Sequence, residues 1–110
     1  MYGLKDIHIN KIQSVFANYS NIEKAILYGS RAIGNFRNGS DIDLTLIGEN
    51  LDLSSLFKIE NDIDDLLLPY KTDISIFQKI ENPELVDHIN RVGKVFYEKS
   101  VSSSLSTNTN

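Results

Sequence analysis

The sequence predicts an α/β (α+β) domain in which helices pack against a small sheet. Segments with helical spacing of apolar residues alternate along the chain with three or four short strand-like segments, a pattern typical of a two-layer domain. The 110 residues are enough for one hydrophobic core. The hydrophobic share of 41% and the charged share of 24% are ordinary for a globular protein. We therefore expect one domain over residues 1–99.

The first half of the chain contains two predicted helices and two predicted strands. A helix is predicted from Asp6, its N-cap, to Asn18, because apolar residues recur at helical spacing. A strand over Lys24–Tyr28 then leads into a turn at Gly29-Ser30 and a short helix near Arg31–Ile33. The second strand is expected over Asp41–Ile47.

The second half continues this alternation. A long helix is predicted over Ser54–Leu67, and Pro69 stops it because proline has no N–H group to continue the helical hydrogen bonds. The third strand, Lys71–Phe77, alternates polar Asp73 and Ser75 with apolar residues.

The C-terminal part contains a final helix and strand. Asn82-Pro83 is a cap followed by a first-turn proline, and it opens a helix that Gly93 ends. Lys94–Glu98 is expected to be a short edge strand. Residues 100–110 contain no charged or aromatic side chain, so we expect a disordered Ser/Thr/Asn tail.

Composition argues against several classes of protein. The net charge of −4 does not favour direct binding of nucleic acid, which needs clustered Lys and Arg. No apolar run approaches the twenty or so residues of a membrane helix, and no signal-peptide pattern is present. The absence of cysteine excludes disulfides and zinc–thiolate sites. We expect a cytoplasmic protein without a membrane partner.

The chemistry of the chain is concentrated between Gly29 and Asp43. Asp41 and Asp43 project from the same face of a strand, about 6.6 Å apart along it. Two such carboxylates repel each other, and a divalent cation between them relieves the repulsion. Upstream, beyond a connection of ten residues, lies Gly29-Ser30. Gly29 lacks a Cβ atom and lets peptide N–H groups approach an anion, while Ser30 can cap a short helix whose N-terminus favours phosphate.

These residues resemble the nucleotidyltransferase superfamily that includes DNA polymerase beta and the kanamycin nucleotidyltransferases. The fuller pattern Gly-Ser-Arg-Ala-x-Gly, followed by Ser-Asp-Ile-Asp-Leu, looks like the minimal, MNT-type branch of bacteria and archaea. Many members of that branch are antitoxins paired with a HEPN-domain toxin. The resemblance covers roughly Lys24 to Phe77 and implies a palm-like mixed sheet of three to four strands with helices packed on one face.

The resemblance also implies roles for individual residues. Asp41, Asp43 and Asp73 would be the catalytic carboxylates that hold two Mg²⁺ ions, and Asp73 would help take the proton from the attacking hydroxyl. Gly29, Ser30 and Arg31 would bind the phosphates of ATP, which is the nucleotide implied by the resemblance alone. Thr72, before the third Asp, is less apolar than the family pattern.

Each assignment has a structural alternative. The paired aspartates would otherwise form a solvated strand face, and Asp73 a surface carboxylate. Arg31 is as well suited to brace the loop through a carboxylate as to touch phosphate, whereas Arg37 is expected to face solvent. Phe36 and Tyr70 are expected to pack rather than to stack on a base. Asp62, Asp64 and Asp65 are expected to form a solvated helix face and not a metal site. His8 and His88, on predicted helices far from the motif, are expected to be structural or surface residues.

Two functions of different classes follow. The first is an enzyme, a type VII-like antitoxin that transfers AMP from ATP to a hydroxyl, typically of tyrosine, on a HEPN RNase toxin with which it forms a hetero-oligomer. The alternative is a non-catalytic nucleotide-binding subunit that neutralises its partner by complex formation. A transferase for a small molecule such as an aminoglycoside is less favoured, because no acceptor-binding domain is evident.

Overall fold

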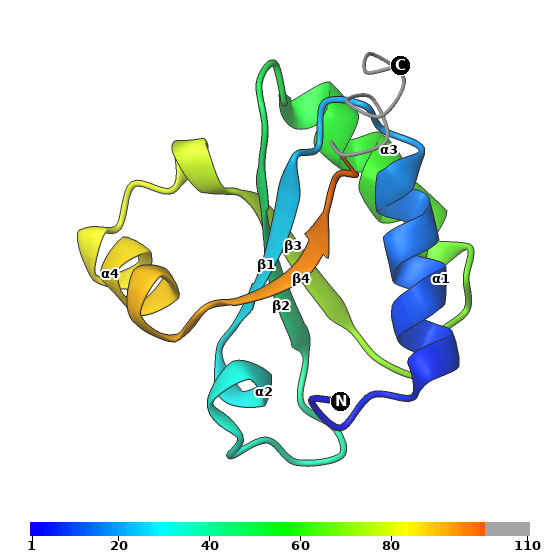
Figure 1. Cartoon of the computed structure of the whole chain (residues 1–110), viewed down its shortest axis with the longest axis vertical. Coiled ribbons are helices and arrows are strands. Elements are labelled where there is room, and N and C mark those ends of the chain that lie inside the picture. Colours follow the sequence, from blue (N-terminus) through cyan, green and yellow to red (C-terminus); the bar gives the residue numbers. More distant parts are fainter. Residues whose placement is uncertain (101–110) are drawn as a thin grey trace, which may run out of the picture.

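The computed structural model describes residues 1–100, and these form one α/β domain (Figure 1). Residues 101–110, which make up most of the predicted tail, lie outside the described residues. The elements in chain order are α1 Asp6–Ala17, β1 Lys24–Tyr28, α2 Ser30–Ile33, β2 Ile42–Ile47, α3 Leu53–Asp64, β3 Thr72–Ile76, the 3-10 turn η1 Phe77–Lys79, α4 Pro83–Val92 and β4 Lys94–Glu98.

The four strands form a mixed sheet in the order β3-β2-β1-β4. β1 lies at the centre and pairs antiparallel with β2 and with β4, whereas β2 pairs parallel with β3. The predicted fold class, with a mixed sheet of up to four strands, is therefore confirmed. The bounds predicted for β1 and β4 agree with the structure, while β2 and β3 are slightly shorter than predicted.

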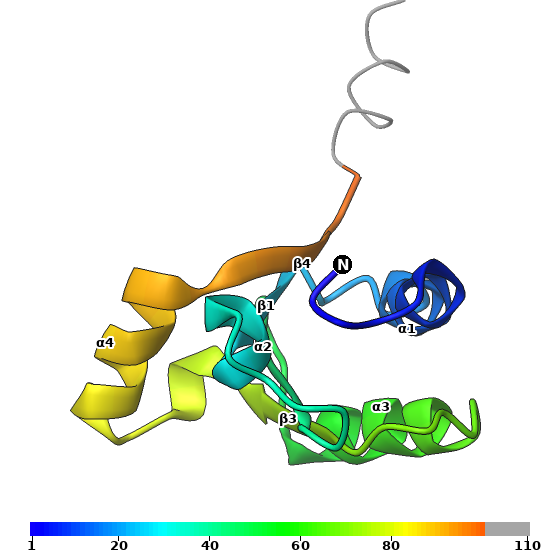
Figure 2. The same ribbon diagram turned by 90° about the horizontal axis from the view of Figure 1, so that it is seen from below.

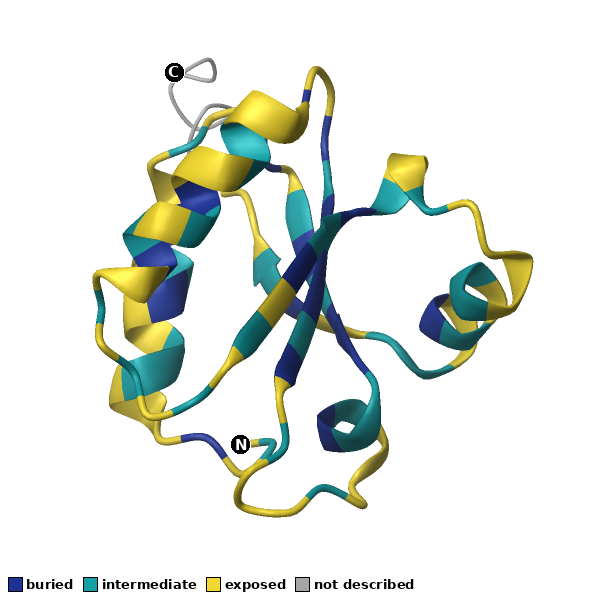
Figure 3. Ribbon diagram, turned by 180° about the vertical axis from the view of Figure 1, so that it is seen from behind, coloured by how far each residue is buried: buried dark blue, intermediate teal, exposed yellow. Residues whose placement is uncertain are grey.

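The core lies between one face of the sheet and helices α1 and α3 (Figures 2 and 3). The alternating apolar residues of the strands point to this face, as their period of two requires. The helices add buried apolar residues at helical spacing. The fully buried core residues include Ile12, Phe16, Ile22, Ala25, Leu27, Ile42, Leu44, Leu46 and Ile59.

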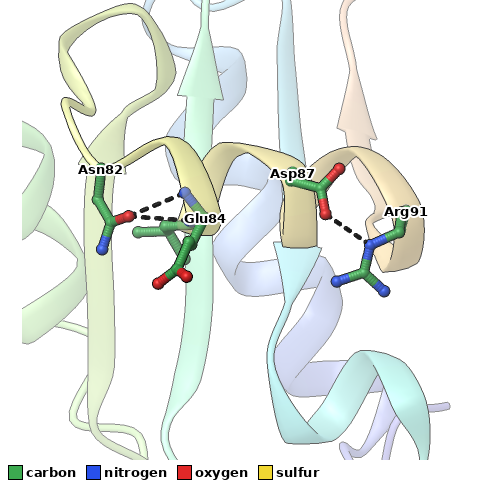
Figure 4. Close-up of polar contacts among 5 residues, drawn as sticks. Asn82, Glu84, Asp87 and Arg91 are labelled. Carbon is green, nitrogen blue, oxygen red and sulfur yellow. Dashed lines mark hydrogen bonds and ion pairs between the residues drawn. The ribbon is translucent and has the colours of Figure 1, made fainter.

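Helix α4 lies on the opposite side of the sheet from α1 and α3 (Figure 2). Asn82 caps it, because the Asn82 side chain accepts hydrogen bonds from the N–H groups of Glu84 at 2.9 Å and Leu85 at 3.4 Å (Figure 4). The Asp87–Arg91 ion pair, 2.8 Å long, lies on its exposed face. The expectation of helices on one face thus holds for α1 and α3, and α4 adds a helix against the second face.

The helix ends differ from the predicted ones for local reasons. Asp6 is the first helical residue of α1 rather than its cap. α3 begins at Leu53 because the Asp52 side chain accepts the N–H of Ser55 at 2.8 Å. It ends at Asp64, before Leu67, which has a φ of 55°. Within residues 1–100, no helix combines the length and apolar character needed to cross a membrane.

Candidate active site

The register of the sheet places two of the predicted carboxylates side by side. Asp43 of β2 pairs with Asp73 of the parallel strand β3, and on its other side it pairs with Tyr28 of β1. Neighbouring strands lie about 4.8 Å apart, so these three side chains form one row on the face away from the core. Asp43 is half-buried and Asp73 is exposed.

A second row of residues supports the first. Two residues along the strands, Thr45 of β2 pairs with Ser75 of β3, and the Ser75 hydroxyl donates to Thr45 Oγ1 at 2.9 Å. Thr45 is fully buried. This bond links the two strands directly behind the aspartates and fixes the spacing between them.

Asp41 lies just before β2, on the same face by strand alternation, and is exposed. The N–H of the following residue, Ile42, donates to the carbonyl of Lys71 at 2.8 Å, which holds the start of β2 against the segment that leads into β3. The three predicted carboxylates therefore come from adjacent strands at one end of the sheet.

The electrostatics of Asp43 reflect this crowding. Partial burial raises the pKa of the Asp43 carboxyl above its ordinary value, and the negative charges of Asp73 and then Asp41 raise it further. Positive charge on the nearby His88 ring would oppose these effects on the Asp43 pKa. Charge repulsion among three carboxylates is the condition that a bound cation relieves.

The donor set fits Mg²⁺ in an open site. Among the described residues, no three acidic, His or Cys side chains converge on a preformed metal cage. Mg²⁺ usually takes only one or two carboxylates and completes its octahedron with waters and substrate phosphates. Asp43 and Asp73 provide such a pair, with Asp41 beside them.

The predicted phosphate turn lies directly against Asp43. Gly29 has φ 76° and ψ −158°, a conformation essentially restricted to glycine. A Cβ atom on Gly29 would overlap the Asp43 carboxylate and come within 3.3 Å of its Cγ atom. Glycine is therefore needed here both for its backbone conformation and for the close approach of turn and carboxylate.

The short helix α2 begins at this turn. Gly29 rather than Ser30 is the N-cap, and the Gly29 carbonyl accepts the N–H groups of Ala32 at 3.1 Å and Ile33 at 3.2 Å. Since the first N–H groups of a helix have no carbonyl within it to bond, those of Ser30 and Arg31 are left at the turn, next to the carboxylates.

The Arg31 side chain braces the loop, which is one of its two expected roles, but it does so through main-chain carbonyls and not through a carboxylate. It is only 2% exposed, and each guanidinium nitrogen donates to a main-chain carbonyl: Nε and Nη2 to Ser40 at 3.2 and 2.8 Å, and Nη1 to Tyr2 at 2.9 Å. The rings of Phe36 and Tyr70 lie 5.2 and 5.3 Å from the guanidinium carbon. In this arrangement Arg31 braces the loop before Asp41 by donating to main-chain carbonyls. These hydrogen bonds do not go to a carboxylate or to the Gly29 turn.

His88 belongs to the site, and the expectation that it lies far from the motif is wrong. The Gly29 N–H donates to His88 Nε2 at 3.2 Å. The His88 ring also stands edge-on to Tyr28, with 6.1 Å between centroids and 81° between planes. No sequence signal places His88 here, because the contact depends on which face of the sheet α4 covers.

The other candidates lie elsewhere in the fold. His8 contacts Tyr70, whose hydroxyl lies 3.2 Å from His8 Nδ1, and the two rings meet edge-on. Asp62 accepts a hydrogen bond of 2.5 Å from Tyr19, while Asp64 and Asp65 are exposed. Arg37 is exposed, as predicted. These residues have structural or surface positions.

The fold and this arrangement define a nucleotidyltransferase domain. The family model described as "Polymerase beta, Nucleotidyltransferase" matches residues 10–102, and the chain belongs to this family. The resemblance noted from the Gly-Ser and Asp-x-Asp motifs is thereby confirmed at the level of the family.

Solved structures show the same fold at low sequence identity. A toxin–antitoxin structure with AMP-PNP has a TM-score of 0.68 and 19% identity, over 88% of this chain and 78% of that one. The complex of a tri-AMPylated Shewanella oneidensis HEPN toxin with its MNT antitoxin gives 0.64 and 17%, over 93% and 79%. A putative nucleotidyltransferase from Sulfolobus solfataricus gives 0.54 and 16%, over 84% and 78%. No curated protein sequence gives a significant match.

Proposed function

We propose that this protein is a Mg²⁺-dependent nucleotidyltransferase that transfers AMP from ATP to a tyrosine hydroxyl of a HEPN-domain toxin and thereby acts as its antitoxin. The observation that carries the proposal is the pairing of Asp43 with Asp73 beside the Gly29 turn. It brings a carboxylate pair suited to a metal next to main-chain N–H groups suited to phosphate.

The triphosphate would bind at the turn. The Ser30 hydroxyl and the N–H groups that open α2 are the donors nearest the carboxylates, and they would hold the β- and γ-phosphates. Bound Mg²⁺ would supply positive charge to offset the negative charge that develops on the attacking and leaving oxygens. Asp41, Asp43 and Asp73 would hold two such ions, because carboxylate oxygens are their preferred protein ligands.

The reaction is a displacement at the α-phosphorus of ATP. The toxin's tyrosine oxygen forms the new bond, the bond from the α-phosphorus to the bridging oxygen of the β-phosphate breaks, and pyrophosphate leaves with the electron pair. The phenolic proton passes to Asp73, whose exposed carboxylate is reachable by an incoming protein side chain. Asp43, which lies deeper and against the turn, is suited to positioning the triphosphate.

The proposed partner is supported by the structural neighbours. One similar structure is a toxin–antitoxin pair with an ATP analogue, and another contains a HEPN toxin that carries three AMP groups. The net charge of −4 agrees with a protein acceptor rather than a nucleic-acid backbone.

The test is intact-mass analysis of the product of the neighbouring open reading frame, the expected HEPN protein, after incubation with this protein, ATP and Mg²⁺. We expect mass increases of one or more adenylyl units with the wild type and none with Asp43→Asn or Asp73→Asn. Asp64→Asn is the matched control, because Asp64 is an exposed aspartate on α3, on the other face of the sheet from the candidate site. This variant should transfer AMP at the wild-type rate. A tight complex without any mass change would instead favour the non-catalytic binding subunit.

A further inference from the structure

His88 connects helix α4 to the Gly29 turn, two parts of the fold that are distant in the sequence. It lies on α4, 59 residues after Gly29, yet its Nε2 accepts the Gly29 N–H at 3.2 Å. Because a neutral imidazole has one donor and one acceptor nitrogen, acceptance at Nε2 leaves the ring proton on Nδ1. The ring is also fixed from the side by its edge-on contact with Tyr28.

This hydrogen bond controls the orientation of the Gly29 peptide. Gly29 has a backbone conformation that few residues adopt, and a single glycine without a side chain does little to hold it. The peptide on one side of Gly29 is anchored by His88, and the carbonyl on the other side accepts the N–H groups that close the first turn of α2. Rotation of the Gly29 peptide would therefore move Ser30 relative to the Asp43 carboxylate, which lies against Gly29.

The helix that carries His88 is held firmly in place. Its N-terminus is capped by Asn82, Ile89 is 4% exposed, and Gly93 lies so close to Ile26 that a Cβ atom there would be 2.6 Å from Ile26 Cγ2. These contacts anchor α4, and a group on an anchored helix positions a neighbouring turn more precisely than a group on a loop would.

We propose that His88 is a positioning residue for nucleotide binding, which holds the Gly29 peptide so that Ser30 and Asp43 face the triphosphate. The inference rests on the proposed nucleotide site and adds to it a residue outside the Gly-Ser and Asp-x-Asp motifs. It also implies that the Gly29 N–H is a structural donor, and that the Ser30 hydroxyl and the N–H groups that open α2 supply the contacts to phosphate.

The test compares two substitutions that differ only in the acceptor. His88→Leu keeps an apolar side chain against Tyr28 but removes the acceptor, whereas the Oε1 atom of His88→Gln reaches about as far as Nε2 and can still accept the Gly29 N–H. Gln13→Leu is the matched control. It also removes one hydrogen bond between a side chain and the main chain, the 2.9 Å bond from Gln13 on α1 to the Phe96 carbonyl on β4. The measurement is the affinity for AMP-PNP with Mg²⁺ by calorimetry, together with the melting temperature and the NMR signal of the Gly29 amide.

We expect His88→Leu to weaken AMP-PNP binding about tenfold and to shift the Gly29 amide signal. The affinities of His88→Gln and Gln13→Leu for AMP-PNP should stay within about twofold of the wild-type affinity. Equal affinity of His88→Leu and the wild type would overturn the inference. So would equal weakening in His88→Leu and His88→Gln, because the acceptor would then not matter. Failure of the wild type itself to bind AMP-PNP would count against the proposed function, and the Gly29 amide signal would still report whether His88 holds the turn.

Discussion

The substitution Gly29→Ala tests whether the turn and Asp43 are in contact as the structure has them. Gly29 lies at φ 76° and ψ −158°, where a residue with a Cβ atom is strained by about 1–3 kcal/mol. The added methyl group would also overlap the Asp43 carboxylate, and moving a packed group typically costs a further 1–3 kcal/mol. We expect a loss of about 3 kcal/mol in the free energy of unfolding, which for a domain of this size lowers the melting temperature by roughly 15 °C.

Two other glycines separate these contributions. Gly34 has φ 91°, but no atom lies within 4 Å of the position that an added methyl group would take, so Gly34→Ala should show backbone strain alone, about 1 kcal/mol. Gly39 has neither a positive φ nor a neighbour within 4 Å, so Gly39→Ala should leave stability nearly unchanged. Urea unfolding of the three variants gives the comparison. If Gly29→Ala were no less stable than Gly34→Ala, the close approach of Gly29 to Asp43 would be refuted.

Two further predictions concern the carboxylates and the loop before them. Burial and the charge of Asp73 raise the pKa of Asp43 in the folded state, so the stability that its protonated form contributes is present in acid and lost as the pH rises through that pKa. In EDTA at pH 7, Asp43→Asn should therefore match the wild type in stability or exceed it by up to about 1 kcal/mol after solvent screening. Mg²⁺ should raise the melting temperature of the wild type more than that of the variant. A less stable variant in EDTA would contradict the prediction. Arg31→Lys should lose about 2 kcal/mol, because lysine cannot make the two bonds to the Ser40 carbonyl, and it should weaken Mg²⁺ binding through Asp41. Urea unfolding measures the loss of stability and a Mg²⁺ titration measures the loss of affinity. If neither changed in Arg31→Lys, the bracing role of Arg31 would be refuted.

The parts of the site that were predictable from the sequence are those encoded by short-range pattern. Strand alternation puts Asp41 and Asp43 on one face, and the Gly29-Ser30 turn follows a strand with the bounds predicted for it. The parallel register that sets Asp73 opposite Asp43 is a long-range property, and no local spacing fixes it. The same is true of Arg31, since the groups around its guanidinium come from residues 2, 36, 40 and 70. From the motif alone, Arg31 is equally suited to contact phosphate and to brace the loop, and only the surrounding aromatic rings and carbonyls identify it as a buried brace.

The position of α4 explains both the additional helix layer and the unexpected place of His88. β4 pairs with the edge of β1 that β2 leaves free, so the chain must return from β3 at one edge of the sheet to β4 at the other. It makes this return on the side opposite α1 and α3 (Figure 2). Helix α4 crosses β1 on the face away from the core, where its C-terminal end lies against Ile26 and His88 reaches Gly29. The row from Asp43 to Asp73 is not covered in this way, and Asp43 stays half-buried and Asp73 exposed. One topological choice thus supports the Gly29 turn and leaves the carboxylates exposed enough for the nucleotide and the acceptor hydroxyl that the proposed function requires.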